Sequence, residues 1–224
     1  MRHIAMIPAR MGSQRFKFKN RKFFGHISDF LDKIEWFTKV IVSTDDPVIE
    51  EFAKERNYVV HKRPEYLAGP VVSIKDVFSC VINDMNIENK DIFWLFYLPL
   101  LYRNQDDFQK CKEIIEKPEI KSLCTFIPAK SHPFNCWRYD QNKKLLHQYI
   151  QNDVFRTQDL PPAWEHYHYV CCFKARELPD LNCELINSRT YPFFLDKTTA
   201  EKLVEIDTPE DYERWKKMNK KGGL

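Results

Sequence analysis

The sequence predicts an α/β fold, a doubly wound and mostly parallel sheet with helices on both faces. Short apolar runs alternate with helix-like stretches along the chain, which is the pattern of a parallel sheet covered by helices. The 224 residues and the 43% hydrophobic content suffice for one sizeable core. A polar, cationic loop follows the first apolar run, where such a sheet presents its phosphate-binding crevice. We therefore expect a single domain over residues 1–224.

Eight apolar runs are predicted as strands, with helices between them. In chain order they are His3–Ile7, Lys39–Ser43, Tyr58–His61, Ile92–Tyr97, Ser122–Ile127, Tyr169–Phe173, Tyr191–Leu195 and Leu203–Glu205.

Two of the predicted helices have clear starts. Asp46-Pro47 begins a helix that runs to about Arg56, because proline is favoured in a first turn. Thr208-Pro209-Glu210-Asp211 begins another, and its two acidic residues match the helix dipole. Either Asp207 or Thr208 could cap this second helix.

The stretch 130–168 breaks the alternation. It contains His132-Pro133, Pro161-Pro162 and several aromatic residues without a helical stripe. We interpret it as an insertion whose aromatic side chains pack on a partner subunit or over a pocket. The alternative is an ordinary long loop that covers its own sheet.

Charge and composition exclude several classes of protein. The net charge is +3, from 35 basic and 32 acidic residues, so the basic loop is local and the whole chain is not a nucleic-acid binder. No run of about eighteen apolar residues and no signal-peptide core is present. We expect a soluble cytoplasmic protein with no membrane partner.

The seven cysteines are odd in number and scattered, which indicates reduced thiols. The segment His166 to Cys172 suggests zinc at first sight. On a strand, however, His168 and Cys172 would lie about 13 Å apart, too far to share one tetrahedral ion. A zinc site there is not expected.

The loop from Ile7 to Asn20 carries the residue types that hold a polyanion. These residue types suit a nucleoside triphosphate. The cations are Arg10, Arg15, Lys17 and Lys19, the flexible backbone comes from Gly12, and the hydrogen-bonding side chains are Ser13, Gln14 and Asn20. A solvated basic loop or a nucleic-acid patch would have a similar composition. The two common phosphate fingerprints, Gly-x-Gly-x-x-Gly and Gly-x-x-x-x-Gly-Lys-Ser/Thr, are absent from this loop.

Five blocks in order resemble the CMP-N-acylneuraminate synthetase family, the cytidylyltransferases that activate nonulosonic acids. They span roughly residues 3–215, and together they are more specific than any one alone. The blocks are Ile7-Pro8-Ala9-Arg10 with Gly12-Ser13 and Lys19-Asn20; Val40 to Asp46; Arg63-Pro64-Glu65 with Leu67-Ala68-Gly69; Gln158 to Ala163; and Glu205 to Asp211.

The resemblance implies a fold like that of nucleotide-diphospho-sugar transferases and a homodimer. It also implies a reaction in which CTP and a 2-keto sugar acid give a CMP-sugar and pyrophosphate, for surface glycans such as lipopolysaccharide or capsule. A divalent ion, Mg²⁺ or Mn²⁺, would bridge the phosphate oxygens. The aromatic residues of the insertion, including Trp137, Tyr139, Phe155 and Trp164, would then be buried by the second subunit.

The resemblance also assigns roles to residues. Arg10, Lys19 and Asp207 would be catalytic. Nucleotide ligands would be Arg10, Gly12, Ser13, Gln14, Lys19, Asn20, Arg63 and Ser73; substrate ligands would be Tyr97, Arg103, Gln158 and Tyr169; metal ligands would be Asp207 and Glu205. Three of these have simpler alternatives, because Asp207 could cap a helix, Arg63 could lie at the surface and Glu205 could be a solvated strand end. For Asp45 and Asp46 a turn or cap role is expected.

The sequence departs from the family mainly on the acceptor side. Residues 95–103 are apolar where relatives carry a polar segment, and Glu205 replaces an aspartate. An apolar site around Phe96, Tyr97 and Tyr102 would suit a deoxygenated or N-acylated sugar acid, unless these residues belong to the core. Two other functions stay open, a cytidylyltransferase for another acidic sugar such as 3-deoxy-manno-octulosonate, and a non-catalytic nucleotide-binding relative.

Overall fold

A seven-stranded sheet organises the computed structural model, which describes residues 1–12 and 15–221, with side chains as far as residue 219. Ser13 and Gln14, two predicted nucleotide ligands, lie outside the described residues. The sheet has the order β3-β2-β1-β4-β8-β5-β9. Its strands are β1 (His3–Ala9), β2 (Phe37–Thr44), β3 (Val59–Lys62), β4 (Ile92–Leu95), β5 (Ser122–Pro128), β8 (Trp164–Lys174) and β9 (Tyr191–Phe194).

Most neighbouring strands are parallel, as predicted. Strand β1 pairs in parallel with β2 and β4, β2 with β3, and β5 with β9. Strand β8 is the exception, because it runs antiparallel between β4 and β5. The doubly wound α/β class is therefore confirmed.

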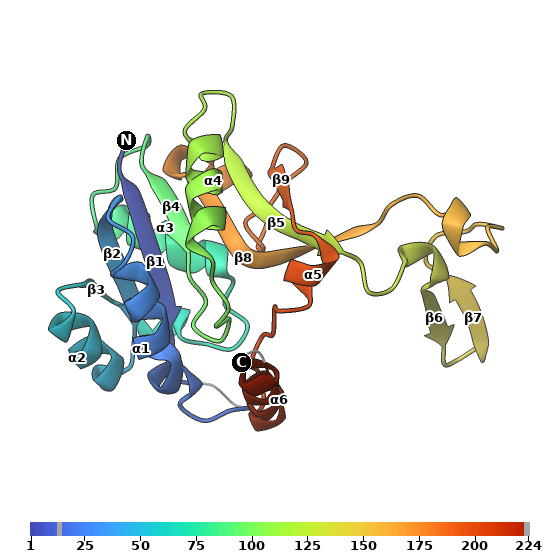
Figure 1. The fold of residues 1–224 in the computed structure, drawn as a ribbon, viewed down its shortest axis with the longest axis horizontal. Coiled ribbons are helices and arrows are strands. Elements are labelled where there is room, and N and C mark those ends of the chain that lie inside the picture. The colour runs from blue at the N-terminus through green and yellow to red at the C-terminus, as the bar shows by residue number, and fades with distance from the viewer. Residues whose placement is uncertain (13–14, 222–224) are drawn as a thin grey trace.

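Helices cover both faces of the sheet (Figure 1). The helices α1 (Lys19–Leu31), α2 (Pro47–Glu55) and α4 (Gln105–Ile115) pack on one face, and α3 (Ile74–Asp84) packs on the other. Strand β1 shows why: Ala5 and Ile7 join the first hydrophobic cluster, while Ile4 and Met6 join the second. Side chains alternate across a strand, so a strand that is apolar throughout needs cover on both sides.

The predicted helix starts are confirmed, and the open question at the second is resolved. Asp46 caps α2 by accepting a 3.0 Å hydrogen bond from Val48 N. Before α6 (Pro209–Lys221), the Thr208 hydroxyl accepts from Asp211 N at 3.2 Å, and the Asp211 carboxylate accepts from Thr208 N at 3.0 Å. This reciprocal pair satisfies the helix start, so the Asp207 side chain remains available for another role.

Two predicted strands differ from the observed ones by more than two residues. Residues 203–205 form no strand among the described residues and make only an isolated bridge between Leu100 and Glu205. Leu100 lies past the carboxyl end of β4, so this segment crosses the end of the sheet instead of extending its edge. Strand β8 begins at Trp164, five residues before the predicted start, so the last part of the expected insertion belongs to the main sheet.

The rest of the insertion forms an arm that extends away from the sheet (Figure 1). Its hairpin consists of β6 (Trp137–Asp140) and β7 (Leu145–Gln148). The alternative of a loop covering its own sheet is therefore wrong, since the arm leaves many apolar side chains exposed. They include Trp137, Tyr139, Leu145, Leu146, Tyr149 and Phe155.

All seven cysteines are free thiols, as predicted. None of the helices within the described residues has the length and apolar character needed to cross a bilayer.

Asp91 ties the start of the chain to the start of β4. Its carboxylate is fully buried, forms an ion pair with the Arg2 guanidinium, and accepts from Arg2 N at 3.1 Å and Glu88 N at 3.0 Å. Burial by itself raises the pKa of Asp91, but the hydrogen bonds from Arg2 and Glu88 outweigh it and hold that pKa below its ordinary value. The charged form therefore stabilises the fold.

We expect Asp91→Asn to lower the free energy of unfolding at pH 7 by about 2 kcal/mol, the scale of hydrogen bonds to a charged group. The difference from wild type should shrink in acid, because a depressed folded pKa gives stability above the unfolded value of about 3.9 that is lost below it. Urea unfolding at pH 7 and pH 3 measures both effects. Asp29→Asn, at an exposed ion pair with Arg56, is the control. An equal loss at both pH values would contradict the charge-based account.

Candidate functional site

A cavity of about 540 Å³ opens at the carboxyl ends of β1, β3 and β4. This is the edge at which doubly wound sheets bind ligands. Residues from five separate segments line it: Pro8, Arg10, Arg15, Lys19, Asn20, Arg63, Leu67, Gly69, Pro70, Val72, Ile74, Val77, Tyr97, Pro99, Glu205 and Asp207. Four cations and two carboxylates thus face one volume.

The start of α1 is arranged for an anion. Phe18 precedes the helix in a left-handed conformation, with φ of 54°, and contributes no side-chain cap. The first turn contains no acidic residue, and Lys19 is its first residue. Uncapped amide groups, the positive end of the helix dipole and a lysine together favour phosphate.

Asp207 holds the cations of the loop in place. Its carboxylate oxygens lie 2.7 Å from Lys19 Nζ and 2.6 Å from Arg15 Nη2. Lys19 is largely buried, whereas Arg15 is exposed. The sequence gives Arg15 a charge but no ligand role, whereas the structure places it in the cavity wall.

Arg63 is buried in the cavity wall, so the alternative of a surface residue is wrong. Its Nη2 donates to the Ser43 carbonyl oxygen at 2.9 Å and its Nε donates to Ser43 Oγ at 3.2 Å. Burial lowers the pKa of Arg63 to about 10, which still leaves it charged at neutral pH. These two hydrogen bonds to Ser43 hold the guanidinium in the cavity wall.

Asn20 lines the cavity but also has a structural bond. Its Nδ2 donates to the Arg10 carbonyl oxygen at 2.8 Å and so fixes the turn after β1. Two predicted nucleotide ligands, Gly12 and Ser73, do not line this cavity. Gly12 is exposed with open space at its Cβ position, and Ser73 caps α3 by accepting from Asp76 N at 3.1 Å. The expected cap role is confirmed for Asp46, which caps α2. Asp45 instead accepts from Met11 N at 2.8 Å, a bond to the loop after β1 and not a turn or cap in its own segment.

A second cavity, of about 290 Å³, adjoins the first and shares Tyr97 and Glu205 with it. Its other lining residues are Leu100, His166, Tyr167, His168 and Glu184. His168 Nε2 lies 3.0 Å from the Glu184 carbonyl oxygen, and burial lowers the pKa of His168, so its ring is neutral at neutral pH. Partial desolvation and then the charge of Asp207 raise the pKa of Glu205.

The predicted acceptor residues are only partly brought together. Tyr97 lines both cavities. Tyr169 is fully buried and its hydroxyl donates to Asp107 at 2.8 Å, so it is a packing residue rather than a ligand. Gln158 lies in the arm, in the short helix Thr157–Asp159. Arg103 lines neither cavity in the described part of the chain, although its Nε has no hydrogen-bond partner there.

The expected apolar acceptor site is not present. Phe96 is fully buried in the first hydrophobic cluster, and Tyr102 stacks on Tyr169. The sequence reasoning instead missed His166, Tyr167 and Glu184. No sequence signal could have found Glu184, because it comes from a loop and meets the strand residues only in the fold. Among the described residues, the histidines of this segment gather with Glu184 and not with Cys171 or Cys172, which are buried in the sheet.

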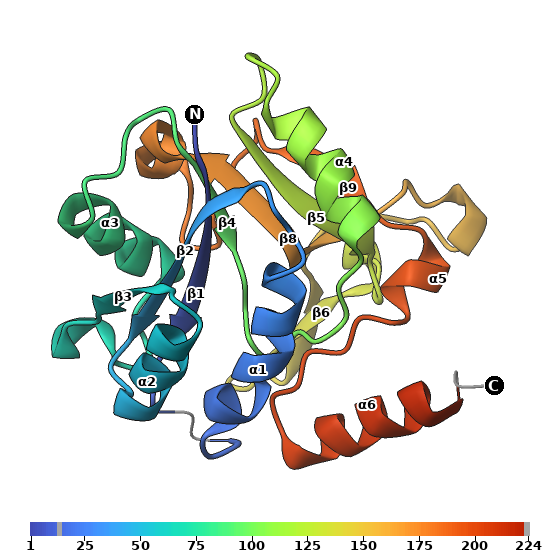
Figure 2. The ribbon, with the colours of Figure 1, turned by 60° about the vertical axis from the view of Figure 1, so that its left-hand side comes forward.

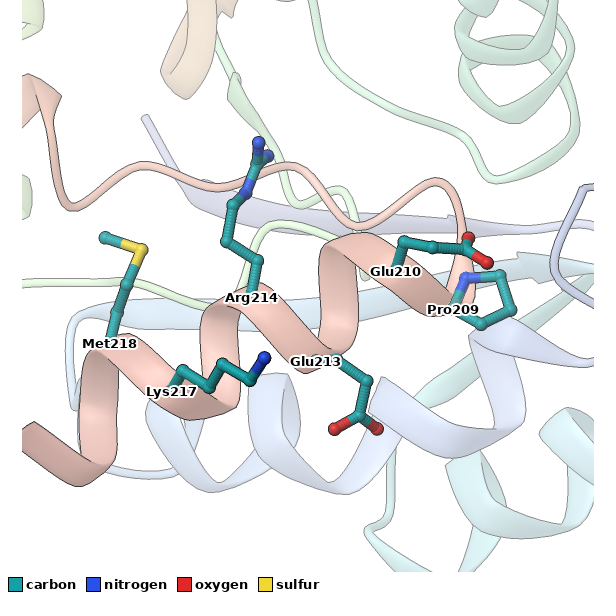
Figure 3. A pocket seen from close by; sticks show the side chains of 6 residues that line it. All are labelled: Pro209, Glu210, Glu213, Arg214, Lys217 and Met218. Atoms are coloured by element: carbon teal, nitrogen blue, oxygen red, sulfur yellow. The ribbon is translucent and has the colours of Figure 1, made fainter.

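A further hollow lies along α6 (Figure 3). Its described lining consists of Pro209, Glu210, Glu213, Arg214, Lys217 and Met218, all from that one helix. No second element closes it, and the cations and carboxylates of the sheet edge are elsewhere. We therefore do not place the site there.

The fold and the cationic cavity at its carboxyl edge define the chain as an α/β nucleotidyltransferase-like protein. Residues 4–222 match the sequence profile described as "Cytidylyltransferase". The chain therefore belongs to the cytidylyltransferase family. No curated protein matches the sequence significantly.

Solved structures agree with this fold. A CMP:2-keto-3-deoxy-manno-octonic acid synthetase complexed with CTP superposes with a TM-score of 0.67 at 14% identity, covering 99% of this chain and 100% of that one. A cytidylyltransferase from Leptospira borgpetersenii serovar Hardjo-bovis gives 0.59 at 16% identity, covering 95% and 84%. A 4-diphosphocytidyl-2C-methyl-D-erythritol synthase gives 0.59 at 12% identity, covering 94% of each chain.

We expect Asp207→Asn to tighten the binding of inorganic triphosphate in metal-free buffer by about threefold to fivefold, the scale of a partly exposed ion pair. Removing the carboxylate charge frees Lys19 and Arg15 for the anion. Lys19→Gln should weaken the same binding, and isothermal titration calorimetry measures both. Asp180→Asn, at an ion pair with Arg189 outside the cavity, should change nothing. Weaker metal-free binding by Asp207→Asn would show that its carboxylate does not compete with phosphate.

Proposed function

We propose that the protein transfers CMP from CTP to a 2-keto sugar acid and releases pyrophosphate. The observation that carries this proposal is the junction of the two cavities. The larger one presents cations to a triphosphate, and the smaller one adjoins it at Tyr97 and Glu205. An acceptor hydroxyl in the smaller cavity would thus reach the α-phosphorus of a nucleotide in the larger one.

The nucleotide is held by charge and by fixed donors. Arg10, Arg15 and Lys19 neutralise the triphosphate at the start of α1, where the helix dipole adds to their field. Arg63, anchored by Ser43, also lines this cavity and would donate to the cytosine carbonyl. Catalysis then consists mainly of positioning and charge neutralisation as the bond between the α- and β-phosphates breaks.

The reaction in this proposal uses Mg²⁺ or Mn²⁺. Glu205 and Asp207 both line the cavity, and carboxylate oxygens are the protein ligands that these ions prefer, so the residues fit the ion. When bound, the ion would neutralise charge on the phosphate oxygens. Asp207 would then exchange its contacts with Lys19 and Arg15 for the ion, which leaves both cations free for phosphate.

The acceptor is a sugar acid of the nonulosonic type, destined for surface glycans, as the sequence resemblance suggests. The lining of the smaller cavity by tyrosine hydroxyls, imidazoles and carboxylates favours a hydroxylated acceptor over the deoxygenated one that an apolar site would take. A second candidate is 3-deoxy-manno-octulosonate. The structural likeness over the full length of a synthetase for that sugar acid favours it.

A pyrophosphate-release assay with each of CTP, UTP, ATP and GTP, Mg²⁺ and a panel of sugar acids tests the proposal. We expect turnover with CTP and a 2-keto acid. Arg10→Ala and Asp207→Ala should each lower kcat by roughly 100-fold, as expected when a group that stabilises transition-state charge is removed. Arg189→Ala, at an exposed ion pair outside both cavities, is the control.

The assay also separates the alternatives. Turnover with the octulosonate alone would select the second candidate. CTP binding without product from any acid in the panel would favour a non-catalytic relative. A preference for UTP, ATP or GTP would contradict cytidylyl transfer.

The working form in this proposal is a homodimer joined through the arm. The hairpin presents Tyr139 and Leu146 as directly opposed residues, exposed by 58% and 62%, and Phe155 beyond it is exposed by 91%. Apolar side chains gathered on an extended hairpin favour burial by a second subunit. Gln158 lies on the same arm, so it could serve the partner's acceptor cavity.

We expect the wild-type chain to sediment as a dimer at micromolar concentration. The double variant Tyr139→Asp, Leu146→Asp should sediment as a monomer. Both residues of this cross-strand pair would then carry a negative charge on the surface that the second subunit buries. Met218→Asp, at an exposed apolar residue of α6, should leave the dimer intact. A wild-type chain that remains monomeric would remove the dimer from the proposal.

A further inference from the structure

A second cluster of chemically active side chains lies outside both cavities. His61 on β3 and Cys80 and Asp84 on α3 bring their donor atoms together on the face of the sheet that α3 covers. Figure 2 shows α3 next to β3, the edge strand of the sheet. Cys80 and Asp84 are four residues apart on α3, so they share one side of the helix.

The three donor atoms have the spacing of a tetrahedral metal site. His61 Nε2 lies 3.0 Å from Asp84 Oδ2 and 3.7 Å from Cys80 Sγ, and Cys80 Sγ lies 3.3 Å from Asp84 Oδ2. A zinc ion at its usual bond lengths to nitrogen, oxygen and sulfur would set these three separations at about 3.4 to 3.6 Å. Shifts of a few tenths of an ångström would therefore accommodate an ion.

The surroundings supply what such a site needs besides ligands. His61 is 2% exposed, and its other ring nitrogen, Nδ1, lies 3.0 Å from Ser43 Oγ, a partner that fixes the ring. A surface hollow lined by Cys80 and Asp84, among others, provides an entry path and room for a water as fourth ligand. The hydrogen bonds between the three side chains preserve their arrangement in the metal-free protein.

We propose that His61, Cys80 and Asp84 form a binding site for a thiolate-preferring divalent cation of the zinc class. A sulfur, an imidazole and one carboxylate select such an ion over Mg²⁺, which prefers oxygen ligands alone. The Cys80 thiol loses its proton to the buffer on binding, so that the thiolate and the Asp84 carboxylate balance the charge of the ion. In the metal-free protein His61 Nε2 donates to the Asp84 carboxylate. On binding, Nε2 gives up that hydrogen and takes the ion, and the neutral ring carries its one proton on Nδ1, from which it donates to Ser43 Oγ.

An ion at this site would fix the edge strand β3 to α3, beneath the nucleotide cavity. Ser43 Oγ, which faces His61, also accepts from Arg63 Nε at 3.2 Å. Leu67 and Val72 line both the cavity and the hollow. An ion joining β3 to α3 would therefore stabilise the wall that carries Arg63, and this structural role does not depend on the reaction proposed above.

A cobalt titration of the full chain tests the proposal, with Co²⁺ as a spectroscopic substitute for zinc and a phosphine reductant that does not bind the ion. We expect a thiolate-to-cobalt absorption band that saturates at one Co²⁺ per chain, and loss of that band when Zn²⁺ is added. Cys80→Ser should abolish the band, and Asp84→Asn should weaken cobalt binding at least tenfold. Cys183→Ser, at an exposed cysteine elsewhere, should keep the band.

Thermal unfolding provides the second measurement. Zn²⁺ should raise the Tm of the wild type by about 5 °C at a hundredfold excess over Kd, and should leave the Tm of Cys80→Ser unchanged. The other histidine cluster, at His166 and His168, contains no thiol and so cannot give the sulfur band. Absence of the band in the wild type, or its persistence in Cys80→Ser, would overturn the proposal whatever the outcome of the pyrophosphate assay.

Discussion

The carboxylate of Asp207 unites the two ends of the chain at the cavity, and the rest of the site depends on it. It contacts Arg15 and Lys19 across separations of 192 and 188 residues. Without a counter-charge, cations gathered at the uncapped start of α1 would repel one another. Because Thr208 and Asp211 satisfy the start of α6 by themselves, Asp207 is free for this role.

These ion pairs also lower the net charge at the cavity. Pairing with Asp207 limits the cost of gathering like charges near α1. In the function proposed above, a polyanion would take over these cations and a divalent ion would take over the carboxylates, so the local charge would stay nearly balanced. The aromatic contacts of Tyr212 with Phe16 and Phe23 fix α6 beside α1 and so maintain the geometry of the exchange (Figure 2).

The two faces of the sheet are packed differently. On the face of α1 and α4, Phe96, Tyr102 and Tyr169 pack in a continuous aromatic and aliphatic core, although the sequence interpretation places them near the acceptor. On the face of α3, His61 contacts the hydroxyl of Ser43, and that hydroxyl accepts a hydrogen bond from Arg63 Nε. The cavity wall that carries Arg63 is thus supported by a polar network, whereas the smaller cavity is lined by residues of β8 and by Glu184 from a loop.

The sequence alone determined the α/β class, the positions of the main strands along the chain, the cap of α2 and the cationic loop. These follow from local patterns: apolar runs, proline after a cap residue, and charge density in one short loop. Tertiary structure decided which aromatic residues are core, that residues 203–205 cross the sheet end, and that Glu184 meets His166 and His168. Those outcomes depend on contacts between residues remote in sequence, and hydrophobicity or charge at a single position cannot tell whether it faces a core, a cavity or a partner.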